Sequence, residues 1–189
     1  MDIIERHPFE PFLPSNAKLL IMGTFPPTQN RWSMNFYYPN RINDFWYMMG
    51  LIFTGDKNYF YDKENKTFYL DKIKEILENK GIALSDTGYE VKRLKGNASD
   101  KFLQIITPTP LFELLKQIPN CKNIATTGEK AAMVMAEITN TKMPKIGECV
   151  ASEDGLYLWR MPSTSRAYPL ALEKKAEFYE KMFRLIGII

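Results

Sequence analysis

The sequence contains very little cysteine and histidine, and this scarcity excludes several classes of site. Its two cysteines, Cys121 and Cys149, are far apart and match no metal-ligand spacing. A disulfide scaffold, a zinc ribbon and a four-cysteine iron–sulfur cluster are therefore excluded. His7 is the only histidine, which removes most catalytic triads and histidine-based metal centres. We expect neither a metal nor another cofactor.

Long apolar runs are also missing. No stretch approaches the roughly 18 apolar residues that a membrane-spanning helix needs. The N-terminal residues include acids and prolines where a signal peptide would have an apolar core. No glycine-rich pattern of the dinucleotide-binding or phosphate-loop type occurs either. We expect a cytoplasmic protein that does not act at a membrane.

What the sequence does contain is typical of one globular domain. Its 189 residues fit a single domain spanning 1–189. A content of 45% apolar and 25% charged residues is ordinary for a folded chain. The 25 basic and 22 acidic side chains leave a net charge of +3, which permits nucleic acid as a partner without requiring it. We expect a monomer.

Four short apolar runs predict buried strands, at 18–23, 82–86, 123–127 and 156–161. Continuous runs of this kind are typical of parallel sheets that are covered on both faces. Segments with helical spacing alternate with them. We therefore predict an α/β fold, a three-layer α/β/α sandwich with a central, mainly parallel four-stranded sheet.

The helices are predicted from apolar residues three and four positions apart. The first is expected to be capped by Asn40 and to bury Ile42 along with Phe45, Trp46 and Met49. Further helices are expected in four places: from Leu70 to a terminating Gly81, after Pro110, after Gly128 and from Leu172. Three polar segments are predicted to be irregular: 54–66, 87–100 and 139–155.

Ligands of such sheets bind beyond the carboxyl ends of the strands, and two loops there are distinctive. The loop after the first strand contains, in order, Gly23-Thr24-Phe25-Pro26-Pro27, Asn35-Phe36-Tyr37-Tyr38-Pro39 and Asn43-Asp44-Phe45-Trp46. The loop after the fourth strand reads Met161-Pro162-Ser163-Thr164-Ser165. With these motifs the chain resembles the uracil-DNA glycosylase superfamily. The resemblance is strongest to its sixth, hypoxanthine-DNA glycosylase-like branch, followed by the mismatch-specific glycosylases.

The resemblance implies a monofunctional DNA glycosylase that releases deaminated bases, hypoxanthine or uracil, by hydrolysis and without a metal. DNA containing such bases would be its partner. Asn43 would be the catalytic residue and would orient the attacking water or the base. The base pocket would consist of Gly23, Thr24, Phe25, Pro26, Phe36, Tyr37 and Met161. The DNA phosphate would lie against Pro162, Ser163, Thr164, Ser165 and Arg166, and Arg166 could instead wedge into the vacated base stack.

The chemistry of these residue types suits such a site. An extruded base needs an aromatic face to stack on, and residues 36–38 offer three. The Asn43 amide carries both a donor and an acceptor for a base edge. Serine and threonine hydroxyls can bind a phosphate. Negative charge develops on the departing base, and backbone donors near Thr24 and Phe25 could stabilise it.

Alternative interpretations stay open. Phe25 and Met161 stand where much of the superfamily has polar catalytic groups, so the pocket could bind a base or a damaged strand without releasing the base. A small-molecule enzyme acting on a nucleotide or nucleoside is a third possibility. Asn43 could simply cap a helix, residues 36–38 could be hydrophobic cover, and the serine-rich loop could be a plain turn. Asp86 could face the pocket or bond to its own turn, and we expect His7 to fix the N-terminal segment.

Overall fold

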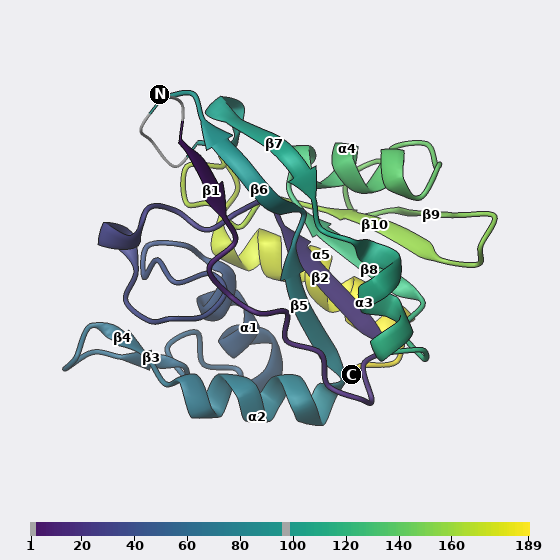
Figure 1. The fold of residues 1–189 in the computed structure, drawn as a ribbon. Helices are drawn as coiled ribbons and strands as arrows, with labels where there is room; N and C mark the ends of the chain where they lie inside the picture. Colours follow the sequence, from purple (N-terminus) through teal and green to yellow (C-terminus); the bar gives the residue numbers. More distant parts are fainter. Residues whose placement is uncertain (1–2, 96–98) are drawn as a thin grey trace.

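The computed structural model describes residues 3–95 and 99–189. Its main sheet has the strand order β5 (Ile82–Asp86), β2 (Leu19–Gly23), β8 (Asn123–Thr127), β10 (Tyr157–Met161) and β9 (Cys149–Ala151) (Figure 1). The first four strands of this order run parallel to their neighbours, and β9 runs antiparallel to β10 at the edge. The four strands predicted from the sequence are confirmed. The four-stranded sheet is corrected to a mixed sheet of five strands.

The additional strand β9 lies in the segment 139–155, which was predicted to be irregular. It has three residues, and none of them is fully buried. An edge strand pairs on one side only and can stay short. Its three apolar residues, between Glu148 and Ser152, form too short a run to be recognised as a strand in the sequence.

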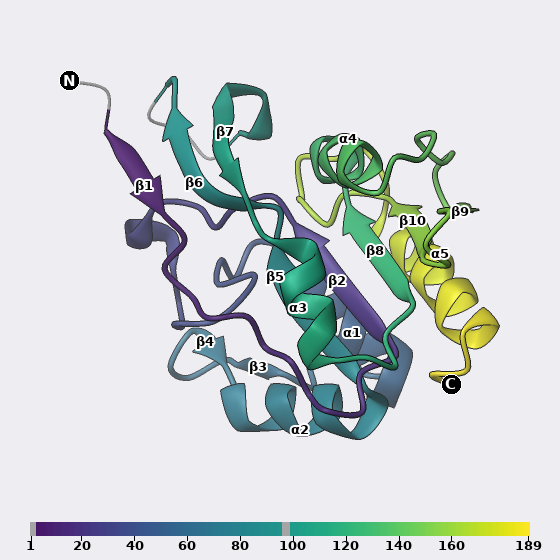
Figure 2. The same cartoon turned by 45° about the vertical axis from the view of Figure 1, so that its right-hand side comes forward.

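Helices cover both faces of the main sheet (Figures 1 and 2). One face carries α1 (Phe45–Thr54), α2 (Leu70–Lys80) and α5 (Leu172–Leu185), and the other carries α3 (Leu111–Gln117) and α4 (Glu129–Ile138). Successive residues of a strand point to opposite faces. Leu19 and Ile21 therefore belong to one core, whereas Leu20 and Met22 belong to the other. The predicted three layers are confirmed.

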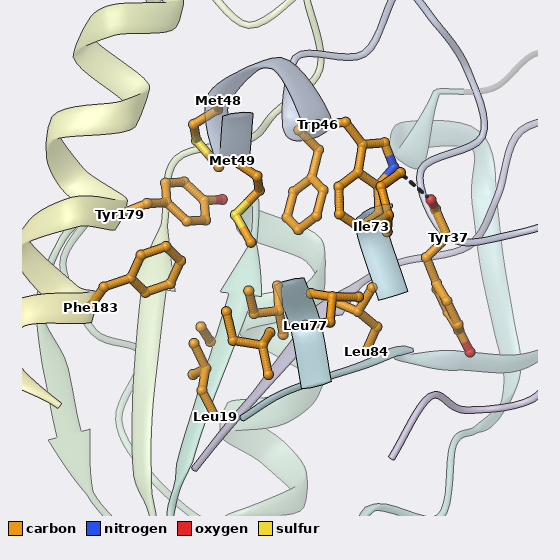
Figure 3. Packing of buried hydrophobic residues seen from close by; sticks show 14 of the residues in the cluster. Leu19, Tyr37, Trp46, Met48, Met49, Ile73, Leu77, Leu84, Tyr179 and Phe183 are labelled. Carbon is orange, nitrogen blue, oxygen red and sulfur yellow. Dashed lines mark hydrogen bonds between the residues drawn. The ribbon is translucent and has the colours of Figure 1, made fainter. Parts of the chain in front are cut away.

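The core beneath α1, α2 and α5 is rich in aromatic residues and methionine. Figure 3 shows Leu77 of α2 and Phe183 of α5 beside Leu19 of the sheet. Trp46 is also buried there, and its indole N–H donates to the backbone oxygen of Tyr37 at 3.0 Å (Figure 3). This bond ties the loop after β2 to the first turn of α1.

Helix α1 begins at Phe45, and its N-cap is Asp44, four residues later than the predicted cap Asn40. Asn40 Oδ1 accepts the N–H of Ile42, and Asn43 Oδ1 accepts the N–H of Phe45. These two side-chain turns hold the preceding residues outside the helix. Ile42 is consequently 52% exposed instead of buried. The predicted helices at α2, α3, α4 and α5 are confirmed, and Gly81 ends α2 in a left-handed conformation with φ of 66°.

A second, antiparallel sheet has the order β1 (Ile4–Arg6), β6 (Gly88–Arg93) and β7 (Leu103–Pro108). The prediction of a loop over 87–100 was therefore wrong for β6, while 96–98 lie outside the described residues. A single residue separates the end of β5 from the start of β6, so this sheet stands beside the carboxyl ends of the main strands (Figure 1). The remaining short elements are η1 (Gln29–Arg31), β3 (Tyr61–Asp62), β4 (Thr67–Phe68) and η2 (Asp100–Phe102).

Within the two described ranges, every helix is too short or too polar to cross a lipid bilayer.

Candidate functional site

A cavity of about 310 Å³ opens beyond the carboxyl ends of β2, β5 and β8 and next to the loop that follows β10. The chain runs from β2 outward to β5, then returns to β8 on the other side of β2 and continues to β10. A parallel sheet has its natural ligand crevice at such a reversal of strand order. Both loops singled out in the sequence reach this cavity, and the predicted residues lining it are Gly23, Thr24, Phe25, Pro26, Asn43, Ser163, Thr164, Ser165 and Arg166.

Four predicted site residues do not line this cavity. Phe36 and Tyr37 are buried in the core next to α1, where Trp46 holds the Tyr37 backbone. Met161 and Pro162 line a neighbouring cavity of about 720 Å³ beside α4. Only the third ring of the aromatic run, Tyr38, lines the candidate site.

Tyr38 and Thr127 form part of the cavity floor. Tyr38 has φ of 52°, a rare conformation for a residue other than glycine, and its ring stacks on Phe45 with 3.8 Å between ring centres. Its hydroxyl lies 3.0 Å from Thr127 Oγ1. Burial raises the pKa of Tyr38 well above its ordinary value, and the negative charge of Asp86 adds to this rise. The phenol is therefore a protonated hydrogen-bonding group at neutral pH.

Asp86 completes the floor from the end of β5. Its Oδ2 lies 2.8 Å from His7 Nε2, and both side chains are less than a tenth exposed. Among the described residues, no hydrogen bond reaches Asp86 Oδ1. A Cβ placed on Gly23 would lie 2.7 Å from that oxygen, so only glycine leaves room for it. Asp86 thus faces the cavity and has one acceptor oxygen to offer.

His7 is held through both of its ring nitrogens. Its Nδ1 lies 3.2 Å from the Phe9 nitrogen and 2.9 Å from the Phe9 oxygen. This nitrogen can accept the Phe9 N–H or, when it carries a hydrogen, donate to the Phe9 carbonyl. The ring also packs edge-on against Phe25 and stacks on Tyr37. His7 therefore joins the N-terminal segment to the cavity floor.

Asn43 holds its amide in one orientation. Its Oδ1 accepts the Phe45 N–H at 2.9 Å, so the oxygen faces the start of α1 and the NH₂ group faces away from it. In the described part of the chain, no hydrogen bond uses Asn43 Nδ2. Asn43 both closes a turn and lines the cavity. What it can offer a ligand is a hydrogen-bond donor.

A buried ionic network fixes the serine-rich loop. Lys175 of α5 is completely buried, and its Nζ lies 2.8 Å from Asp44 Oδ2 and 2.8 Å from the Ser165 oxygen. Arg166 Nε lies 3.1 Å from Asp44 Oδ1, and the Asp44 N–H donates to the Thr164 oxygen. The loop after β10 is thus attached to both α1 and α5. A sequence signal for Lys175 exists, because it precedes the buried Tyr179 by one helical turn.

Asp100 is the second carboxylate that lines the cavity, after Asp86, and no motif in the sequence points to it. Its Oδ2 accepts a hydrogen bond from the Thr24 hydroxyl at 2.9 Å. Burial of the carboxyl group raises its pKa, while Thr24 and the nearby Lys130 oppose that rise. The group lies at the boundary between the candidate site and the cavity beside α4.

Comparisons with protein-family models and with curated proteins gave no match. Among solved structures, the chain is similar to a solution NMR structure from Methanosarcina acetivorans, of a protein provisionally described as a uracil DNA glycosylase. The TM-score is 0.68 at 21% sequence identity, and the match covers 98% of this chain and 99% of that one. This chain therefore has the fold of that protein over nearly its whole length.

Proposed function

We propose that the protein is a DNA glycosylase that hydrolyses the N-glycosidic bond of deaminated bases, hypoxanthine or uracil. The observation that carries this proposal is the single cavity in which Asn43, the loop after β2 and the serine-rich loop meet. The similarity in fold to a protein described as a uracil DNA glycosylase supports it. A cavity of about 310 Å³ is at the lower end of the range for small-molecule sites and suits one extruded base.

The floor of the cavity offers a way to read a deaminated base. Loss of the exocyclic amino group from adenine or cytosine converts a ring nitrogen from an acceptor into an N–H donor. Asp86 Oδ1 is an acceptor that faces the cavity, and the ring of Tyr38 lies beside it. A carboxylate accepts an N–H and repels an acceptor nitrogen. We assign the reading of this proton to Asp86.

Asn43 acts in this proposal as a donor that is fixed before the reaction. Negative charge develops on the base as the bond to the sugar breaks, and donors already in place stabilise that charge most effectively. Because Asn43 Oδ1 is bound to the α1 backbone, its NH₂ group can donate to the departing base or hold the oxygen of a water. Ser163, Ser165 and Arg166 would bind a flanking phosphate.

The test is a base-release assay with oligonucleotides that carry uracil, hypoxanthine or xanthine opposite several partners. We expect release of hypoxanthine or uracil by the unmodified protein. The Asn43→Ala and Asn43→Asp variants should both lower the rate by about 10²–10³-fold, the usual effect of losing one such donor. Asn43→Asp keeps the oxygen that accepts the Phe45 N–H, which separates the donor role from the structural one. Asn35→Ala, an exposed position in the same loop, is the control.

A wild-type rate in Asn43→Asp would remove the amide from the mechanism. The rival function is a module that binds a base or damaged strand without cutting it. It is favoured by Phe25, an apolar side chain on the cavity wall that cannot transfer a proton. Tight oligonucleotide binding without base release in the same assay would select this rival. If the affinity for DNA did not depend on the salt concentration, the result would point to a small-molecule enzyme.

A further inference from the structure

Ile42 forms a ridge between two hollows at the mouth of the candidate site. Its side chain lines the cavity on one side and, on the other, a second hollow of about 450 Å³ near Tyr47 and Tyr61. More than half of the residue is exposed, at 52%. A branched apolar side chain thus stands in solvent next to the space that an extruded base would enter.

The turn that carries Ile42 is held on both sides. Asn40 Oδ1 accepts the Ile42 N–H at 3.1 Å, and the Asn40 backbone oxygen accepts the Asn43 N–H at 2.9 Å. The Tyr47 hydroxyl donates to the Arg41 oxygen at 2.9 Å. A side chain on such a fixed turn loses little further conformational freedom when a partner encloses it.

The exposed charges around this ridge are basic. Arg31 lines the cavity mouth, and Arg41, Lys57 and Arg166 line the second hollow. Among the described residues that line the two hollows, the acids are Asp86 and Asp100, and both belong to the cavity. This charge distribution complements the phosphates of a nucleic acid strand on either side of Ile42.

Arg166, the wedge candidate from the sequence, is already engaged. Its Nε binds Asp44 at 3.1 Å, and its guanidinium lies over the Tyr47 ring at 5.6 Å. Entry into a base stack would break both contacts. Ile42 has no such partner to leave, and apolar side chains are the groups that proteins commonly insert between base steps.

We propose that Ile42 is the wedge that enters the base stack of duplex DNA and fills the space left by the extruded base. This inference rests on the proposed function and adds to it a duplex-specific contact. Extrusion breaks the stacking of the base on both neighbours, and an inserted apolar side chain replaces part of that contact. A single strand has no paired stack to hold open, so the wedge acts on duplex substrates.

The experiment compares one lesion in duplex and in single-stranded form. Ile42→Ala should lower kcat/KM about ten- to a hundredfold on the duplex, as expected from the loss of one apolar contact, and less than about threefold on the single strand. Ile42→Leu keeps the apolar bulk and should stay within about threefold on both substrates. Ile106→Ala, at a 42% exposed position on β7, is the control and should match the unmodified protein.

Equal losses on both substrates, or no loss on the duplex, would overturn the wedge. A binding experiment separates this failure from a failure of the proposed function. A duplex with 2-aminopurine beside an abasic-site analogue should brighten when the unmodified protein binds and unstacks the reporter. Ile42→Ala should bind with a weaker fluorescence rise, and Ile42→Leu should restore it. An undiminished rise with Ile42→Ala would exclude the wedge even if no base were ever released.

Discussion

Two buried aspartates adjoin the start of helix α1 and the end of strand β5, and the protein uses them in opposite ways. Asp44 binds Lys175 with one oxygen and Arg166 with the other. Asp86 binds His7 with one oxygen and leaves the second toward the cavity. Burial alone therefore does not mark a functional carboxylate. The useful distinction is whether every acceptor position is already satisfied by the fold.

Asp44 thus has a structural role, whereas Asp86 is available for binding a ligand, although both lie in the same small region of the molecule. Asp44 and Lys175 are 131 positions apart in the chain, and their bond holds the serine-rich loop against two helices. Both oxygens of Asp44 are bound to cations of the fold, and Asp44 does not line the cavity. Asp86 keeps its position through His7 and still has an oxygen for a ligand.

The largest expected effect is the loss of the buried cation. Lys175→Met should lower the free energy of unfolding by about 3–5 kcal/mol, because it leaves the buried Asp44 with only the half-exposed Arg166. Lys174→Met, at the preceding and exposed position of the same helix, should change stability by less than about 0.5 kcal/mol. Urea unfolding of the two variants measures both values. Similar midpoints would show that the buried pair does not hold the loop.

The next prediction concerns the other aspartate. If the proposed function holds, Asp86→Ala should lower the rate of base release by about 10²-fold or more, because it removes the acceptor to which we assign the reading of the base. Its cost in stability should be smaller than that of Lys175→Met, at about 1.5–3 kcal/mol for the bond to His7. The exposed Asp154→Ala should affect neither quantity. If a folded Asp86→Ala protein released the base as fast as the unmodified protein does, Asp86 would have a structural role only, like Asp44.

The sequence identified the parts of the fold that depend on local apolar pattern. β2, β5, β8 and β10 are continuous apolar runs, and their parallel arrangement follows from the helices between them. β1 could not be found in this way, since it pairs with residues more than eighty positions away and none of its residues is buried. Strands without a buried face leave no periodic signal.

The same limit applies to the candidate site. Its two loops were recognisable by their motifs, but the aromatic run could not show which ring enters the cavity. That choice depends on the left-handed backbone at Tyr38 and on the bond from Trp46 to Tyr37. The helical spacing from Lys175 to Tyr179 could have indicated that Lys175 is buried, but not its partner Asp44, which is remote in the chain. Contacts between distant segments decide such features, and one sequence does not record them.

The smallest expected effect belongs to Asp100. This carboxylate lines the cavity, as Asp86 does, and one of its oxygens accepts a hydrogen bond from Thr24. Its pKa is raised, chiefly by burial, so the folded protein binds this proton more tightly than the unfolded chain does. Stability from this group is therefore lost as the pH rises from the ordinary aspartate pKa through the raised value. Asp100→Asn removes the titration, so its stability relative to the unmodified protein should increase slightly from about pH 4 to about pH 7. Urea unfolding across that range measures the difference. A difference that shrinks with rising pH would mean that Thr24 and Lys130 outweigh burial and that Asp100 is a bound structural carboxylate like Asp44.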